Sequence, residues 1–299
     1  MRRTTSFLLL PLLAVGLLSG CGSGTKSPLP TVKGAYGSKP SFTFPSKTPP
    51  KTLMSKVLHE GSGPVVGKGD LLVGDYLGQV WDGKVFDNSY DRKAAAGFAI
   101  GVGKVIPGWD DVLVGVKAGS RVLMSIPPAK GYGTSGNAQA GIKGTDTLVF
   151  VVDVVASYNT SVAGDTKAAV QKVVTPGVTV KGALGAVPTV TVAKGTKGPT
   201  KPVVTLLAKG TGAPVAAGLL VVQYSATAYD GTIAGSTWKD GSPAGVPIAA
   251  SGSNTAFDEL RGIPLGSRVL IQLPGASGQP AVAVAVDLVA QPKTAAESG

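Results

Sequence analysis

Short apolar runs separated by turn residues recur along most of this chain. Three of them in the first half are rich in Val and Leu, namely Leu71 to Trp81, Ser120 to Ile126 and Leu148 to Ala156. Runs of this length and composition, bounded by Gly, Pro, Asp or Ser, are typical of β-strands. Asp82-Gly83 directly follows the first run, and such a dipeptide between two strands predicts a hairpin.

One segment has the pattern of a short helix. Pro107 stands at a favoured first-turn position, and Asp110 and Asp111 follow near the positive end of the helix dipole. The apolar residues fall at helical spacing and give the helix one apolar face: Trp109, Val112, Leu113 and Val116. The pattern predicts an antiparallel sheet that curls around a single short α-helix, which is an α+β fold.

The sequence repeats itself over a long interval. Thr31-Val32-Lys33-Gly34-Ala35 recurs as Thr179-Val180-Lys181-Gly182-Ala183, 148 residues later (179 − 31). Tyr76 and Tyr224 keep the same spacing, and Gly119-Ser120-Arg121 recurs as Gly266-Ser267-Arg268 after the loss of one residue. Such self-similarity indicates two copies of one domain. We expect tandem domains at 31–158 and 179–290, a linker at 159–178 and a disordered tail at 291–299.

The first residues predict export. Arg2 and Arg3 precede an apolar run from Phe7 to Leu18, and Leu18-Ser19-Gly20-Cys21 follows. A basic head, a short apolar segment and small residues before a cleavage site are typical of a secretory signal. The last four residues resemble a bacterial lipobox, in which the cysteine is lipidated. The prediction is a signal peptide at 1–20, a lipid anchor on Cys21 and a flexible tether at 21–30.

This N-terminal pattern has an alternative, an ordinary signal peptide with an incidental cysteine. Both interpretations place the protein outside the cytoplasm. The lipidated form would be held at the extracytoplasmic face of the cell membrane.

Composition and charge narrow the function classes. The 299 residues include 43 Gly and 22 Pro, and only 15% are charged, which suits β-rich domains with many turns. The formal net charge of +11 falls to +9 (11 − 2) when Arg2 and Arg3 leave with the signal. Export makes nucleic acid an unexpected partner. The scattered lysines favour solubility over a dedicated basic patch, although anionic lipids or wall polymers would also suit the charge.

The inventory of reactive residues excludes several chemistries. The single cysteine allows no internal disulfide. The only histidine, His59, is expected on a strand without nearby ligands, so we expect neither a metal site nor a histidine-based triad. Gly131-Tyr132-Gly133-Thr134-Ser135-Gly136 fits a dinucleotide-binding pattern, but no helix-forming stretch follows it. We therefore expect a flap loop there, no metal and no cofactor.

Several residues together resemble, in order and spacing, the pattern of FKBP-type peptidyl-prolyl cis-trans isomerases: Tyr76, Phe86-Asp87, Phe98, Val105-Ile106-Pro107-Gly108-Trp109, Tyr132-Gly133 and Leu148-Val149-Phe150. The resemblance covers roughly Lys56 to Val155. It implies a half-barrel sheet wrapped on a helix, with an aromatic pocket that accepts proline. The implied partners are proline-containing unfolded or exported polypeptides, and macrolides as inhibitors.

The resemblance also implies roles for individual residues. Trp109 would form the pocket floor, and the walls and further substrate contacts would be Tyr76, Phe86, Phe98, Val105, Ile106, Ile142 and Phe150. The backbone N–H of Ile106 and the Tyr132 hydroxyl would hold substrate carbonyls. Asp87, held by Arg92, would either present its carboxylate to the carbonyl carbon of the twisting bond or fix the orientation of Tyr76. Taken singly, each aromatic has an alternative role as a core residue, and Asp87 an alternative role in a turn.

The sequence departs from the family pattern at Ala96, where an aromatic is common, at Asn137 in the flap and at Lys104 beside Val105. Ala96 predicts a wider pocket with lower macrolide affinity.

The second copy departs further. Phe86, Asp87 and Trp109 align with Ala234, Gly235 and Phe257, and the flap is shortened and has no tyrosine. Two functions follow from the whole sequence. One is an isomerase, active in the first copy, that assists the folding of exported proteins. The other is a non-catalytic chaperone or docking module that uses the same scaffold.

Overall fold

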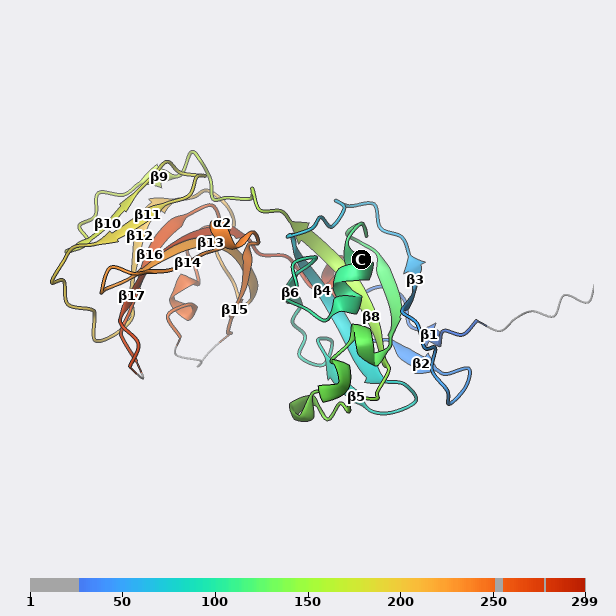
Figure 1. Ribbon diagram of the computed structural model, residues 1–299. Helices are drawn as coiled ribbons and strands as arrows, with labels where there is room; N and C mark the ends of the chain where they lie inside the picture. Colours follow the sequence, from blue (N-terminus) through green and yellow to red (C-terminus); the bar gives the residue numbers. More distant parts are fainter. Residues whose placement is uncertain (1–26, 251–254, 277, 299) are drawn as a thin grey trace, which may run out of the picture.

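The strands of a computed structural model form two large antiparallel sheets, and the sheets follow one another along the chain (Figure 1). The structure describes residues 27–250, 255–276 and 278–298. The predicted signal peptide and Cys21 lie outside these residues. Across the described ranges, no helix combines the length and the apolar character that a membrane crossing requires. We call β1 to β8 the N-terminal unit and β9 to β17 the C-terminal unit.

The sheet of the N-terminal unit has the strand order β3-β7-β8-β4-β5, and β6 also pairs with β4. Its strands are β3 (Met54–His59), β4 (Leu71–Val80), β5 (Val85–Asn88), β6 (Ala96–Ala99), β7 (Arg121–Ile126) and β8 (Leu148–Tyr158). A separate hairpin is formed by β1 (Thr31–Lys33) and β2 (Ser41–Thr43). The three strands expected from the apolar runs are β4, β7 and β8. The α+β prediction holds for this unit.

One short helix, α1 (Pro107–Leu113), packs in the N-terminal unit and begins at the proline that the sequence indicated. Trp109 and Leu113 are buried in the apolar core between the sheet and the helix. The flap that follows β7 contains three single turns of 3-10 helix, η1 (Pro128–Lys130), η2 (Gly133–Ser135) and η3 (Ala138–Ala140).

The sheet of the C-terminal unit has the order β14-β13-β17-β16-β12-β9, and β15 also pairs with β13. Its strands are β9 (Ala169–Val170), β12 (Val203–Lys209), β13 (Gly218–Ala228), β14 (Ile233–Ser236), β15 (Ala244–Ile248), β16 (Arg268–Leu273) and β17 (Val282–Ala290). A hairpin of β10 (Val178–Lys181) and β11 (Thr189–Val192) accompanies it. The helical elements are α2 (Thr237–Asp240), η4 (Asp258–Leu260) and α3 (Ala295–Ser298). Apart from β9, the path β14-β13-β17-β16-β12 repeats the path β5-β4-β8-β7-β3.

A buried arginine fastens the hairpin to the sheet in both units. Arg121 Nε lies 2.6 Å from Asp153 Oδ1, and the guanidinium also donates to the carbonyl oxygens of Gly34 and Ser38. In the C-terminal unit, Arg268 Nε lies 2.6 Å from Asp287 Oδ1. The Arg268 guanidinium donates to the carbonyl oxygens of Ala183 and Ala186. Carboxylate and carbonyl oxygens together satisfy each buried guanidinium.

The prediction of one short α-helix inside each sheet is wrong for the C-terminal unit. The segment aligned with α1 forms only the 3-10 turn η4. Thr255 stands where Pro107 begins α1, and the stretch from Phe257 to Gly262, at φ +80°, is one residue shorter than the stretch from Trp109 to Gly115, at φ +90°, so the turn ends before an α-helix forms. The four-residue helix α2 lies elsewhere, directly after β14.

The boundaries expected for the connecting segments also need correction. Within the expected linker 159–178, β9 pairs with β12, so part of it belongs to the sheet. Within the expected tether, Leu29 is buried in the cluster that contains Trp81. The expected disordered tail contains α3, and Ala295 in it is fully buried. Apolar burial orders the tether at Leu29 and the tail at Ala295. Backbone pairing with β12 orders β9, whose side chains are exposed.

Candidate active site

A cavity of about 230 Å³ opens between the sheet, α1 and the flap of the N-terminal unit. It is lined by Tyr76, Phe86, Asp87, Phe98, Lys104, Val105, Ile106, Trp109, Tyr132 and Phe150. Tyr76 comes from β4, Phe86 and Asp87 from β5, Phe98 from β6 and Phe150 from β8. The structure therefore brings together side chains that lie up to 74 residues apart in sequence (150 − 76).

Aromatic rings enclose the cavity around Trp109, whose side chain is 4% exposed. The centroid of its ring lies 4.8 Å from that of Phe98, 5.3 Å from that of Phe150 and 5.8 Å from that of Tyr76. All three pairs meet edge to face, the arrangement favoured by the charge distribution of aromatic rings. The result is a rigid apolar wall.

Gly78 on β4 makes room for this wall. A Cβ atom at Gly78 would lie 2.6 Å from Phe86 and 2.7 Å from Phe150, so no larger residue fits between the two rings and the strand. We did not single out Gly78 from the sequence. A signal was present, because a glycine inside a strand often marks a close approach of another group.

Asp87 forms the polar side of the cavity together with Tyr76 and Arg92. The Tyr76 hydroxyl donates a hydrogen bond to Asp87 Oδ2, and the Arg92 guanidinium donates to Asp87 Oδ1 at 2.5 Å and to the Tyr76 hydroxyl at 2.9 Å. Burial opposes ionisation of Asp87, but the hydrogen bonds from Tyr76 and Arg92 outweigh it and lower the pKa of the carboxyl. Burial and the hydrogen bond to Asp87 raise the pKa of Tyr76 to about 12. At neutral pH Asp87 is therefore a carboxylate and Tyr76 a neutral phenol.

Three residues that line the cavity carry hydrogen-bond donors without protein partners. Among the described residues, none accepts a hydrogen bond from the backbone N–H of Ile106, from the Tyr132 hydroxyl or from the Trp109 indole N–H. Ile106 immediately precedes the first turn of α1. The Ile106 N–H and the Tyr132 hydroxyl are free to bind carbonyl oxygens of a ligand, whereas the Trp109 indole N–H is buried.

Asp110 positions the loop that carries Val105 and Ile106. Its two carboxylate oxygens accept hydrogen bonds from the backbone N–H groups of Gly101 at 2.6 Å and Gly103 at 2.8 Å. From the sequence we assigned Asp110 only a favourable interaction with the helix dipole. Its second partner, the preceding loop, became visible only in the folded chain.

Most of the residues expected at the site lie at this cavity, with two exceptions. Arg92 does not line it but contacts two residues that do. Ile142, expected to contact substrate, is 4% exposed and packs in the core cluster, outside the lining set. Asn137, noted as a departure in the flap, accepts a hydrogen bond from the Ala140 N–H and so shapes the loop.

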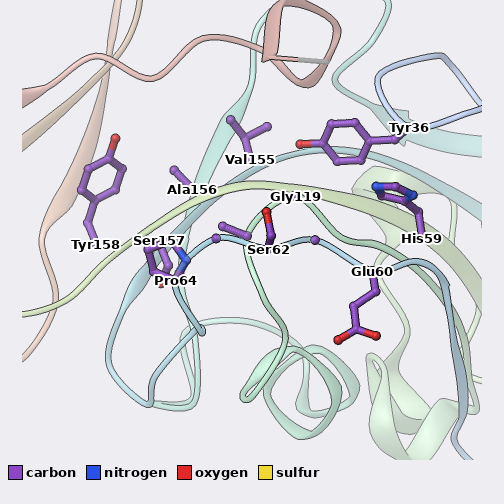
Figure 2. A pocket seen from close by; sticks show the side chains of 13 residues that line it. Tyr36, His59, Glu60, Ser62, Pro64, Gly119, Val155, Ala156, Ser157 and Tyr158 are labelled. Atoms are coloured by element: carbon purple, nitrogen blue, oxygen red, sulfur yellow. The ribbon is translucent and has the colours of Figure 1, made fainter.

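A larger cavity, of about 600 Å³, lies elsewhere on the N-terminal unit and is shown in Figure 2. The rings of Tyr36 and His59 lie side by side there, with their centroids 5.8 Å apart. Glu60 is paired with Lys117 at 2.8 Å. This cavity has no enclosing cluster of aromatic rings, so its size does not make it the better site for an apolar ring.

Comparison with known proteins identifies relatives of one kind. The family described as FKBP-type peptidyl-prolyl cis-trans isomerase matches residues 63–155. The chain is 39% identical over 119 residues to an FK506-binding protein of Streptomyces anulatus, a match that covers 40% of this chain and 96% of that protein. It is 38% identical over 107 residues to the FKBP-type peptidyl-prolyl cis-trans isomerase FkpA of Escherichia coli (strain K12), covering 36% of this chain and 38% of FkpA. The crystal structure of FkpA from Escherichia coli aligns with 37% identity and a TM-score of 0.33, over 36% of this chain and 48% of that one.

Proposed function

Since the chain belongs to the family of FKBP-type peptidyl-prolyl cis-trans isomerases, we propose that it isomerises X-Pro bonds of exported polypeptides at the outer face of the membrane. The reaction takes place in the cavity around Trp109. The observation that carries this assignment is the aromatic enclosure, which combines the rings around Trp109 with an unpartnered backbone N–H at Ile106. Its test is the acceleration of cis-trans exchange in a proline peptide by the full chain.

The chemistry requires rotation about one bond. The barrier of an X-Pro bond is near ~20 kcal/mol, and uncatalysed exchange takes tens of seconds. A planar imide has a resonance dipole that water stabilises, and the twisted transition state has lost much of it. A cavity that removes water from the imide therefore favours the twisted form relative to the planar one. A millionfold acceleration would require about 8 kcal/mol of such preference.

Each lining group has a place in this mechanism. The indole of Trp109 receives the proline ring, and Phe86 and Phe150 exclude water from its sides. The Ile106 N–H and the Tyr132 hydroxyl bind the carbonyls on either side of the proline. Asp87, fixed by Tyr76 and Arg92, presents its carboxylate to the twisting imide.

The protonation states of this site predict the pH profile of the reaction. Because hydrogen bonds lower the pKa of Asp87, the carboxylate persists below the usual range of an aspartate and is lost only as the pH falls through the lowered pKa. We expect kcat/KM to stay flat between about pH 5 and about pH 9, since Asp87 stays a carboxylate and Tyr76 a neutral phenol over this range. Exchange spectroscopy from about pH 2 to about pH 9, which includes the acidic limb, is the measurement. In Arg92→Gln the acidic limb should move to higher pH; an unmoved limb would contradict the role of Arg92.

Export is proposed from the N-terminal sequence. Lipidation of Cys21 would hold the folded units at the membrane. In Cys21→Ala, we expect the precursor to remain uncleaved or the protein to leave the lipid phase, because the only acceptor for a diacylglycerol has been removed. Detergent phase partitioning of whole cells measures this, with Ser23→Ala as the control. A Cys21→Ala protein that is cleaved and still partitions with lipid would contradict the anchor but not the isomerase site.

Macrolides are proposed to compete with peptide for the same cavity, and the support is that the Streptomyces relative is named an FK506-binding protein. Ala96 takes the place of a common aromatic and lies partly buried beside the core. The smaller side chain supports a lower macrolide affinity than in relatives that carry an aromatic there.

The C-terminal unit is proposed to be a degenerate, non-catalytic copy of the N-terminal one. The strand registers support the alignment, because Gly78 pairs with Asp87 and Ala226, 148 residues on, pairs with Gly235. The positions of Phe86, Phe98, Trp109 and Phe150 are taken by Ala234, Val246, Phe257 and Val284. With Phe86 and Phe150 replaced by smaller residues, the methyl group of Ala226 is tolerated where the N-terminal unit requires Gly78.

A further inference from the structure

The two units meet through an apolar cluster built from matching positions of both. Leu71 and Val73 of β4 pack with Leu219 and Val221 of β13, and 219 − 71 and 221 − 73 are both 148. Residues near the ends of β8 and β17 join the same cluster in pairs 134 residues apart, Val155 with Val289 and Ala156 with Ala290. When each partner contributes the same surface, the arrangement is that of a two-fold symmetric dimer. The chain thus contains an internal pseudo-dimer.

This interface reaches the isomerase cavity through β6. Phe98 on β6 lines the cavity, and its neighbour Gly97 faces the C-terminal unit. A Cβ atom at Gly97 would lie 3.5 Å from Leu219 Cδ2 and 3.6 Å from Gly245 Cα. Successive side chains of a strand point to opposite faces. In the sheet β6 pairs only with β4, so the C-terminal unit provides its second support.

A second connection runs through the C-terminal tail, which lies against the N-terminal unit (Figure 1). The backbone N–H of Ala295 donates to Asp75 Oδ2 at 2.7 Å, and both residues are buried. Asp75 Oδ1 accepts from the Ser89 hydroxyl at 2.7 Å. Ser89 in turn bonds the backbone N–H and carbonyl oxygen of Tyr76. These bonds fix the chain two residues after Asp87.

Among the described residues, no cation forms an ion pair with Asp75. The tail N–H is therefore one of the few donors that satisfy this buried carboxylate. A buried charge that loses a donor becomes costly, and the surrounding structure relaxes to recover one. Release of the tail would accordingly disturb Ser89 and the end of β5.

The C-terminal unit receives a matching contact from the segment that follows the N-terminal sheet. Gln223, 148 residues after Asp75, donates its side-chain N–H to the carbonyl oxygen of Thr160, which lies just beyond β8. Thr237, 148 residues after Ser89, accepts from the backbone N–H of Tyr224 at 2.8 Å. Each unit thus receives the segment that leaves the last strand of the other. The contact between Ala295 and Asp75 is therefore one of two matching contacts between the units.

We propose that the C-terminal unit positions the isomerase site of the N-terminal unit, through Leu219 against β6 and through the Ala295 N–H on Asp75. Asp75 and Ser89 are positioning residues that hold Asp87 and Tyr76 in place. The inference rests on the isomerase site proposed above. It assigns a function to the copy that has lost the aromatic pocket.

The sharpest test removes single contacts in the full chain. Ala295→Pro deletes the N–H donor at a helix position that tolerates proline, and Ala296→Pro, at the exposed neighbour, is its control. Ser89→Ala deletes the hydroxyl, and Ser89→Thr keeps it, as Thr237 does in the other unit. We expect Ala295→Pro and Ser89→Ala to lower kcat roughly threefold to tenfold with KM little changed, while both controls stay near wild type.

Two further readouts separate positioning from simple loss of stability. Amide hydrogen exchange should accelerate at residues 85–89 in Ala295→Pro, while the protection of β7 and β8 is retained. Leu219→Ala should raise KM, because Phe98 loses support. Wild-type kcat and wild-type exchange at 85–89 in both Ala295→Pro and Ser89→Ala would overturn the inference. An inactive wild-type protein would instead contradict the proposed function, and the exchange measurement would still decide the inference.

Discussion

Alanine at Phe86 or Asp87 is expected to reduce kcat/KM of the full chain for a proline peptide at least about tenfold, a loss of roughly 1.4 kcal/mol or more. Phe86→Ala removes a wall whose ring centroid lies 5.5 Å from that of Phe150, so water enters the cavity. Asp87→Ala removes the carboxylate and leaves Tyr76 and Arg92 without their acceptor. Turnover of a proline tetrapeptide measures both effects.

Two variants calibrate that result. Tyr132→Phe should reduce turnover only modestly, because the exposed flap retains the ring and loses one hydrogen bond. Glu60→Ala removes an exposed carboxylate that pairs with Lys117 outside the lining of the cavity around Trp109, and it should leave turnover unchanged. If Phe86→Ala and Asp87→Ala both turn over like the wild type, the site lies elsewhere. The C-terminal unit, with Ala234 and Gly235 at the corresponding positions, would then need to be tested.

Asp153→Asn is expected to lower the free energy of unfolding by about 3–5 kcal/mol, the usual cost of breaking one partner of a buried ion pair. The Asp153 side chain is 0% exposed and accepts hydrogen bonds from Arg121, from the Gly37 N–H and from the Tyr90 hydroxyl. The isosteric amide leaves the buried Arg121 guanidinium without a counter-charge. Urea denaturation followed by circular dichroism gives the difference.

The matched control for Asp153→Asn is Asp91→Asn. Asp91 pairs with Lys39 at 2.7 Å on the surface, where both side chains are well exposed. Solvent screens such pairs, so this change should cost less than about 1 kcal/mol. Equal costs for the two substitutions would mean that the Arg121 pair does not hold the β1-β2 hairpin to the sheet as we describe.

The periodic parts of the fold could be predicted from the sequence because each rests on local pattern. Apolar runs identified β4, β7 and β8, and the proline with helical apolar spacing identified α1. At the site, the resemblance to the FKBP pattern identified Ile106 and Trp109, which stand three residues apart in one motif. These signals extend over a few residues and depend little on the rest of the chain.

Contacts between residues far apart in the sequence could not be predicted from local pattern. Ala295 and Asp75 are 220 residues apart, and the segment that contains Ala295 is polar enough to suggest disorder. Burial of a single small side chain and one N–H orders it. Gly78 was overlooked for a related reason, since its role depends on Phe86 and Phe150 meeting above the strand. The turn η4 stands where a helix was expected, because the C-terminal copy lacks a proline at the position of Pro107 and has lost one residue before Gly262.

The most direct test of the account is exchange spectroscopy of a proline tetrapeptide with catalytic amounts of the full chain. We predict that cis-trans exchange, which takes tens of seconds unaided, becomes many times faster with the wild-type protein. We also predict that it returns to the uncatalysed rate with the Phe86→Ala, Asp87→Ala double variant. Exchange at the uncatalysed rate with folded wild-type protein, or undiminished exchange with the folded double variant, would contradict the assignment of isomerase activity to the cavity around Trp109.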